Sequence, residues 1–132
     1  MNQIEIFADG ASRGNPGPSS FGVYCSSDGY RHGCVIADTT NNEAEYRGAI
    51  HALEYAVRRG YTDVVLKLDS LLVVKHFHGA FRVRAEHLKP LLVSLKEIAQ
   101  AIPHLRVEHV PRAQNKEADR AANQALDNRQ FG

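Results

Sequence analysis

The order of apolar patterns along the chain is the feature that most constrains its fold. The first third holds short alternating runs separated by turn signals, and the remainder alternates short apolar runs with longer stretches of helical periodicity. We expect the order β-β-β-α-β-α-α-β-α. Strands joined by hairpins, followed by strands separated by helices, predict an α/β domain with a mixed sheet and helices on both faces.

The expected strands are short and bounded by turn residues. They cover residues 1–8, 21–25, 34–37, 64–68 and 105–110. We expect the first strand to end at Asp9-Gly10. Residues 14–18, with the sequence GNPGP, are expected to form a loop because glycine and proline interrupt regular structure.

The expected helices begin at polar caps and end near glycines. Thr40-Asn41-Asn42-Glu43 matches a capping box, in which the first hydroxyl accepts a backbone amide of the first turn. Gly60 ends this helix, because glycine enters the left-handed region without a steric penalty. A short helix is expected over residues 70–77, and longer ones over 87–101 and 116–126.

Composition indicates one globular domain over residues 1–132. The net charge is +1, so any binding of nucleic acid must depend on local sites rather than on global attraction. No apolar run reaches the length of a membrane span, and the N-terminus lacks the pattern of a signal peptide. We therefore expect a cytoplasmic monomer without membrane contact. Cys25 and Cys34 are expected to be reduced, buried thiols.

Acidic residues stand at the ends of several expected elements. Asp9 and Asp69 each follow an apolar strand, at the sheet edge where sites form in open α/β folds. Glu45 and Asp119 lie in the first turns of expected helices. Taken singly, each has a structural explanation as a turn residue or as a partner of the helix dipole. Together they could converge, and mutually repelling carboxylates favour a hard cation such as Mg²⁺ or Mn²⁺.

Four motifs, in order and at matching spacing, resemble those of type 1 ribonucleases H. They are residues 9–17 (DGASRGNPG), 40–46 (TNNEAEY), 69–70 (DS) and 109–119 (HVPRAQNKEAD). The last motif resembles the short-loop form of bacterial and archaeal members. The match covers nearly the whole chain. It implies the ribonuclease H-like fold, a five-stranded mixed sheet whose first three strands are antiparallel, flanked by helices.

The resemblance also implies a chemistry. The family's carboxylates correspond to Asp9, Glu45, Asp69 and Asp119, which would hold two divalent ions, Mg²⁺ or Mn²⁺. One ion helps to form and position the attacking water, and the other stabilises the leaving 3′ oxygen. The implied reaction is endonucleolytic hydrolysis of the RNA strand of an RNA/DNA hybrid, which gives 5′-phosphate and 3′-hydroxyl ends.

Contacts to the hybrid are implied by position within the first two motifs. The implied substrate-binding residues are Ser12, Arg13, Gly14, Asn15, Thr40, Asn41 and Asn42. The asparagines and loop amides would contact the minor groove, where 2′-hydroxyls distinguish RNA from DNA, and Thr40 would contact a DNA phosphate. Helix capping is an alternative for Asn41 and Asn42, and turn formation before Pro16 is an alternative for Asn15.

The chain departs from parts of the family pattern. Leu71 stands where some bacterial members carry a glutamine that touches substrate. Arg112 lies in a short loop where some relatives carry a histidine, and we expect it to act as a catalytic contact to phosphate. The alternative is an ordinary solvated arginine. No basic protrusion is present, and Arg82 and Arg84 are the only permanent cations in the segment 76–86, which predicts weaker binding of the duplex.

Two other functions fit the same motifs. One is a nuclease that also cuts double-stranded RNA, as some short-loop relatives do. The other is a module that binds nucleic acid without cutting it. Loss of any of the four acids would favour the binding module, and all four are present.

Overall fold

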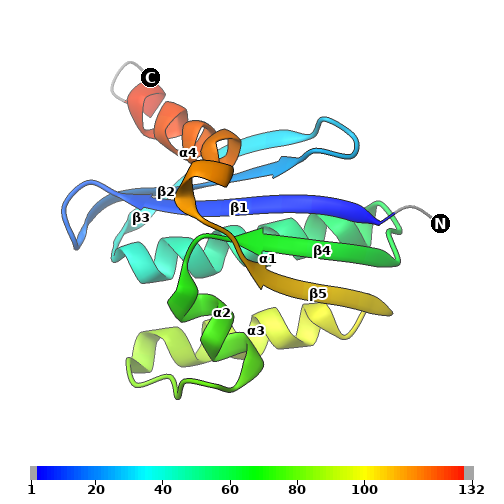
Figure 1. Ribbon diagram of the computed structural model, residues 1–132. Coiled ribbons are helices and arrows are strands. Elements are labelled where there is room, and N and C mark those ends of the chain that lie inside the picture. The colour runs from blue at the N-terminus through cyan, green and yellow to red at the C-terminus, as the bar shows by residue number, and fades with distance from the viewer. Residues whose placement is uncertain (1–2, 130–132) are drawn as a thin grey trace.

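The computed structural model describes residues 3–129, and its centre is a five-stranded sheet in the order β3-β2-β1-β4-β5 (Figure 1). The strands are β1 (Ile4–Ser12), β2 (Gly17–Cys25), β3 (Arg31–Thr39), β4 (Asp63–Leu68) and β5 (His104–His109). The first three strands pair antiparallel, whereas β4 pairs parallel to both β1 and β5. The predicted mixed sheet is confirmed.

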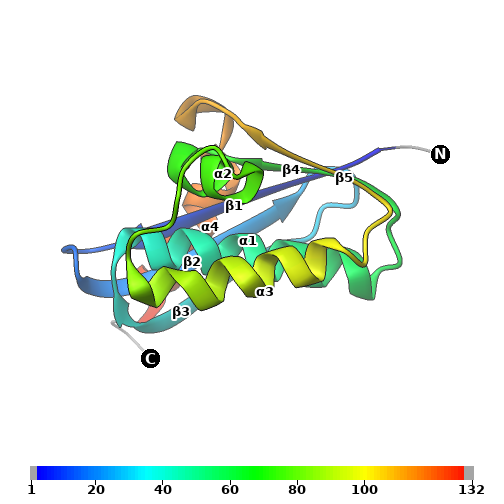
Figure 2. The same ribbon diagram turned by 90° about the horizontal axis from the view of Figure 1, so that it is seen from below.

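Helices cover both faces of the sheet (Figures 1 and 2). The helices are α1 (Asn41–Arg58), α2 (Leu71–His78), α3 (Lys89–Ala99) and α4 (Lys116–Arg129), with short 3₁₀ turns η1 (Glu86–Leu88) and η2 (Arg112–Gln114). Helix α1 packs on β1 and β2 with α3 against its outer side, and α4 packs on β2 and β3 from the opposite face. This arrangement confirms the predicted placement of helices.

The hairpin between β1 and β2 differs from the sequence prediction. β1 does not end at Asp9-Gly10 but continues to Ser12, because its ladder with β2 pairs Asp9 with Gly22 and Gly10 with Phe21. β2 begins at Gly17, inside the expected loop. Pro18, which has no amide donor, is tolerated there because the β2–β3 register shifts between Gly17 and Ser19. Its carbonyl accepts the amide of Arg13 at 2.8 Å. Residues 1 and 2 of the expected first strand lie outside the described residues.

Two glycines on neighbouring strands let helices approach the sheet closely. A Cβ atom at Gly10 would lie 2.3 Å from the backbone nitrogen of Glu45 in α1. A Cβ atom at Gly22 would lie 2.1 Å from the carbonyl oxygen of Ala118 in α4. Both separations are shorter than any side chain permits, so only glycine fits at these crossings. The crossings bring both acid-bearing helices against the sheet near Asp9.

The core and the caps follow the sequence patterns closely. Ile6, Leu53, Leu66 and Leu95 are fully buried, between the sheet and the helices that cover it. Thr40 Oγ1 accepts the amide of Glu43 at 3.2 Å, which confirms the predicted cap of α1. Gly60 and Gly79 adopt φ of 72° and 78°, the left-handed conformation expected after α1 and α2.

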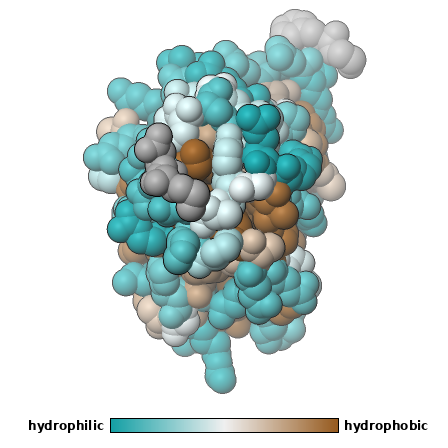
Figure 3. Space-filling view, turned by 90° about the vertical axis from the view of Figure 1, so that its right-hand side faces the viewer, coloured by the Kyte–Doolittle hydropathy of each residue, from teal (hydrophilic) through white to brown (hydrophobic). Residues whose placement is uncertain are grey.

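The face of the molecule shown in Figure 3 is mostly hydrophilic. At the end of the molecule that carries the N-terminus, hydrophilic residues surround separate, small apolar patches (Figure 3). Cys25 is buried, but Cys34 is only partly buried, so the prediction of two buried thiols holds for the first alone; both thiols are free. Within residues 3–129, no helix is both long enough and apolar enough to cross a bilayer.

Candidate active site

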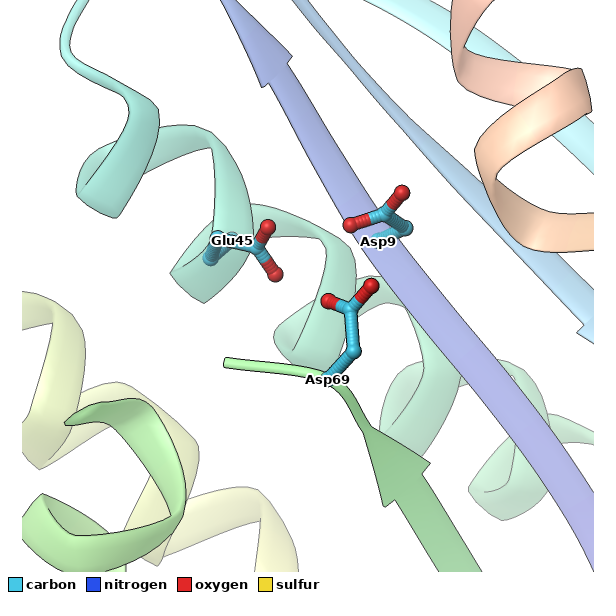
Figure 4. Close-up of side chains that lie close together, drawn as sticks. All are labelled: Asp9, Glu45 and Asp69. Atoms are coloured by element: carbon cyan, nitrogen blue, oxygen red, sulfur yellow. The ribbon is translucent and has the colours of Figure 1, made fainter. Parts of the chain in front are cut away.

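Three carboxylates from different elements converge at one point (Figure 4). Asp9 lies on β1, Asp69 directly follows β4, and Glu45 lies in the second turn of α1. One carboxylate oxygen of each lies within 4.8 Å of the others. β1 and β4 are parallel neighbours that pair Ala8 with Leu68, so Asp9 and Asp69 each follow a paired residue. The structure therefore brings together three of the four acids that the sequence analysis singled out.

The surroundings of Asp9 and Glu45 make it unfavourable for both side chains to be ionised at once. Asp9 is 4% exposed and Glu45 is 5% exposed. Burial raises the pKa of Asp9, and the charge of Glu45 raises it further. Burial also raises the pKa of Glu45, with a further contribution from the charge of Asp69. A cation bound among the three would remove this repulsion.

The hydrogen bonds of the site also favour a bound cation. The amide of Gly10 donates to Asp9 Oδ1 at 3.0 Å. Glu45 Oε2 is buried and has no hydrogen-bond partner within the described part of the chain. An unpaired buried carboxylate oxygen is costly unless a cation coordinates it. The donor set, consisting of oxygen atoms alone, suits a hard divalent ion such as Mg²⁺ or Mn²⁺.

Asp119 lies beside the three converging acids rather than among them. It is half-buried on α4 and lines the same open cavity, of about 400 Å³, as Asp9, Glu45 and Asp69. Asn123 Nδ2 donates to Asp119 Oδ1 at 3.2 Å and to its carbonyl oxygen at 3.0 Å. Asp119 also contributes to the raised pKa of Asp9, so the two side chains interact.

The structure brings some of the predicted substrate-binding residues into this cavity and leaves others at its margin. Ser12, Arg13, Asn41 and the expected catalytic Arg112 all line it. Arg13 is exposed, and its guanidinium pairs with Asp127 of α4 at 2.6 Å.

The remaining predicted residues, Gly14, Asn15, Thr40 and Asn42, do not line the cavity. Asn15 Oδ1 accepts the amide of Asn41 at 3.0 Å, so it caps the start of α1 from outside that helix. Thr40 also caps α1, and its hydroxyl lies 3.3 Å from His87 Nε2. Asn42 faces a neighbouring pocket of about 470 Å³, which Arg82 and Arg84 also line.

Two further polar residues, Asn123 and Ser70, line the cavity, and neither was among the predicted site residues. Asn123 stands four residues after Asp119, a spacing that places both on the same helix face and could have revealed it. Ser70 caps α2 by accepting the amide of Val73 at 3.3 Å, so its position follows from that helix start.

Comparison with known proteins agrees with this geometry. A family model described as "Reverse transcriptase-like" matches residues 7–125. Ribonuclease HI of Halobacterium salinarum is 42% identical over 129 residues, which cover 95% of this chain and 65% of that protein. A crystal structure of RNase H1 from the same archaeon superposes with a TM-score of 0.91 at 40% identity, covering 96% of this chain and 99% of that one. This chain belongs to the ribonuclease H family.

Other family members extend the comparison. A bifunctional protein of Mycobacterium tuberculosis is 41% identical over 133 residues, covering 95% of this chain and 36% of that protein. The chain thus spans between 36% and 65% of the length of these curated relatives. LC11-RNase H1, solved in complex with an RNA/DNA hybrid, superposes with a TM-score of 0.89 at 33% identity, covering 96% of this chain and 99% of that one. The similarity is to ribonucleases H1 of the bacterial and archaeal type.

Proposed function

We propose that this domain hydrolyses the RNA strand of RNA/DNA hybrids endonucleolytically. The observation that carries the proposal is the convergence of Asp9, Glu45 and Asp69 within 4.8 Å, in a fold shared with ribonucleases H1. In the reaction, a water oxygen forms a bond to phosphorus and the bond from phosphorus to the 3′ oxygen breaks. The products carry a 5′-phosphate and a 3′-hydroxyl.

The carboxylates hold the divalent ions in this proposal. Asp9, Glu45 and Asp69 form the centre, and Asp119 completes the set from the α4 side of the cavity. When bound, two Mg²⁺ or Mn²⁺ ions supply an activated water and positive charge beside the leaving oxygen. The buried, unpaired Oε2 of Glu45 supports its assignment as a ligand.

Polar groups around the cavity would bind and orient the hybrid. Ser12, Arg13 and Asn41 line the cavity and can reach 2′-hydroxyls and phosphates of the RNA strand. Asn15, Thr40 and Asn42 lie at the start of α1, where the helix N-terminus favours a phosphate. Gly14, in the β1–β2 hairpin, would contribute a backbone contact. Asn15 can both cap α1 and contact substrate, because it uses only Oδ1 on the amide of Asn41 and keeps its donors.

Arg112 is proposed as a catalytic residue. It is exposed in η2, lines the cavity and stands seven residues before Asp119. Its planar guanidinium can donate two hydrogen bonds to a phosphate whose charge is redistributed during the reaction.

The test is a cleavage assay with labelled RNA/DNA hybrid, duplex RNA and duplex DNA, each with Mg²⁺ and with EDTA. We expect cleavage of the RNA strand of the hybrid with Mg²⁺ and none with EDTA. Equal cleavage of duplex RNA would broaden the substrate class, and binding of hybrid without cleavage would identify a binding module instead. Size-exclusion chromatography checks the monomeric state, which stays a prediction, as does the cytoplasmic location.

A further inference from the structure

The segment between β5 and α4 is anchored at two points on the sheet. The amide of Val110 donates to the carbonyl oxygen of Leu68 at 2.8 Å. Asn115 Nδ2 donates to the carbonyl oxygen of Ala8 at 2.9 Å. Leu68 and Ala8 are the residues that directly precede Asp69 and Asp9. One segment therefore binds the backbone immediately before each of the two acids that β1 and β4 carry.

Asn115 is an unusual residue for so enclosed a place. Its side chain is one of the largest that are fully buried, and only 1% of the residue is exposed. Its Oδ1 has no hydrogen-bond partner in the described part of the chain. A capping asparagine accepts an amide of the first helical turn through Oδ1, so the unpaired Oδ1 means that side-chain capping of α4 does not account for this residue. The orientation of the amide is set by Ala8, whose carbonyl oxygen accepts a donor and repels another oxygen.

The backbone of Asn115 joins the two functional residues of this segment. Its amide donates to the carbonyl oxygen of Arg112 at 3.0 Å, and its own carbonyl accepts the amide of Asp119 at 3.1 Å. A displacement of Asn115 would therefore move both residues relative to Asp9. The bond from Asn115 to Ala8 is the side-chain link that holds this unit against β1.

We propose that Asn115 is a positioning residue, whose carboxamide donor holds Arg112 and Asp119 in place beside Asp9 and the other acids. The inference rests on the proposed nuclease function for its kinetic consequence. Asn115 lies outside the cavity lining, so it acts through its neighbours rather than on the substrate. A shift of about 1 Å in a reacting group can lower a rate about 100-fold.

The competing explanation is that Asn115 serves only the start of α4, where its backbone carbonyl accepts the amide of Asp119, and two substitutions separate the explanations. Asp and Ser cap helices about as well as Asn does. Asn115→Asp is nearly isosteric but presents an oxygen to the Ala8 carbonyl when ionised, and the side chain in Asn115→Ser is too short to reach it. Asn128→Asp is the matched control, because it makes the same chemical change at an exposed position of the same helix.

The experiment measures steady-state kinetics on the hybrid and the Mn²⁺ dependence of the melting temperature for all four proteins. We expect the kcat of Asn115→Asp and Asn115→Ser to fall about 10- to 100-fold, with a change in KM of less than about threefold. The Mn²⁺ concentration at half-maximal thermal shift should rise in both and stay unchanged in Asn128→Asp. Wild-type kcat in either folded Asn115 variant overturns the proposal.

The design separates failure of the inference from failure of the proposed function. If wild type cuts none of the duplexes, the nuclease proposal fails, and the Mn²⁺ titration then decides alone. Equal half-saturation in wild type and Asn115→Ser would overturn the positioning role, and weaker Mn²⁺ binding would support it. If one Asn115 variant does not show a cooperative melting transition, the other decides.

Discussion

Asp9 and Asp28 both lie among several polar neighbours, but those neighbours have opposite character. Asp9 faces the carboxylates of Glu45 and Asp69. Asp28, in the turn between β2 and β3, accepts hydrogen bonds from the hydroxyls of Tyr55 and Tyr61. It also accepts the amide of Tyr30 at 2.8 Å. The neighbouring side chains of Asp9 are acidic, whereas those of Asp28 donate hydrogen bonds.

The two environments shift the two pKa values in opposite directions. Burial and nearby negative charge raise the pKa of Asp9. Burial also acts to raise the pKa of Asp28, but the hydrogen bonds from Tyr55 and Tyr61 outweigh it and lower the pKa to about 2. Hydrogen-bond donors of the protein stabilise the ionised form of a carboxylate such as Asp28. Carboxylates that face one another repel, and a bound cation is needed to stabilise their ionised forms. This difference, rather than residue type, distinguishes the candidate metal site from a structural acid.

The largest expected effect comes from neutralising one acid in each region. Asp9→Asn removes a proposed metal ligand, so cleavage of the hybrid should fall by at least about 100-fold. Asp28→Asn makes the same change in the β2–β3 turn, outside the lining of the cavity, and should leave kcat near that of wild type. Steady-state assays at saturating Mg²⁺ compare the two. Normal turnover by Asp9→Asn would contradict the assignment of Asp9 as a metal ligand.

A smaller effect on cleavage is expected for Arg112→Ala, which changes a residue in the same cavity as the acids. Removal of a contact that strengthens in the transition state should lower kcat about tenfold, with a lesser effect on hybrid binding. Arg112→Lys should restore only part of the rate, because an ammonium cannot reproduce the planar fork. Binding measured in Ca²⁺, to suppress cleavage, separates the two contributions. An unchanged kcat with weakened binding would make Arg112 a plain phosphate anchor.

Metal ions should stabilise only proteins with an intact acid cluster. Binding to the folded state alone stabilises by about 2.7 kcal/mol when the free ion is 100-fold above its Kd. Thermal scans with and without millimolar Mn²⁺ should therefore show a rise of several degrees for wild type and Asp28→Asn. The rise should be much smaller for Asp9→Asn. An equal rise in all three proteins would place the bound ion elsewhere.

The smallest expected effect is on how the free energy of unfolding depends on pH. This dependence should have opposite signs for Asp9 and Asp28. Asp28 has a lowered pKa, so its contribution is present above its ordinary value of 3.8 and is lost as the pH falls toward about 2. Because Asp28 is exposed, Asp28→Asn should cost about 1 kcal/mol or less at pH 7. Asp9 has a raised pKa, so in the metal-free protein its contribution to stability is present below its ordinary pKa of 3.8. That contribution is lost as the pH rises above this value toward the raised pKa of the folded state.

Urea denaturation in EDTA at several pH values checks this contrast. Asp9→Asn should be at least as stable as wild type at pH 7, and its advantage should shrink toward pH 4. Asp28→Asn should be less stable than wild type at pH 7, and its deficit should shrink toward pH 2. Parallel curves for the two variants would contradict the opposite assignments.

Local features of the chain could be predicted from the sequence because their causes lie within a few residues. The cap at Thr40 depends on an amide three residues later, and the helix end at Gly60 depends on that residue's own φ. The alternation of strands and helices followed from periodicity, and the five-stranded mixed sheet with three antiparallel strands followed from the resemblance. The identities of the four acids were available in the same way.

The tertiary structure alone decided which distant groups meet. The end of β1 depends on its ladder with β2, so the turn residues Asp9 and Gly10 did not reveal it. The spacing of motifs predicted convergence but could not place Asp119 beside Asp9, Glu45 and Asp69 rather than among them. Hydrogen-bond partners across a fold depend on how closely backbones approach, and that depends on packing from many positions at once.

Asn115 illustrates the division most clearly. By itself the sequence determined that an asparagine precedes the last helix, a position that ordinary capping explains. Only the folded chain places its amide 2.9 Å from the carbonyl of Ala8, a residue 107 positions away in the sequence. Local patterns report the conformation of a segment, because they reflect contacts within it. A contact between the ends of the chain exists only after the sheet and helices have assembled.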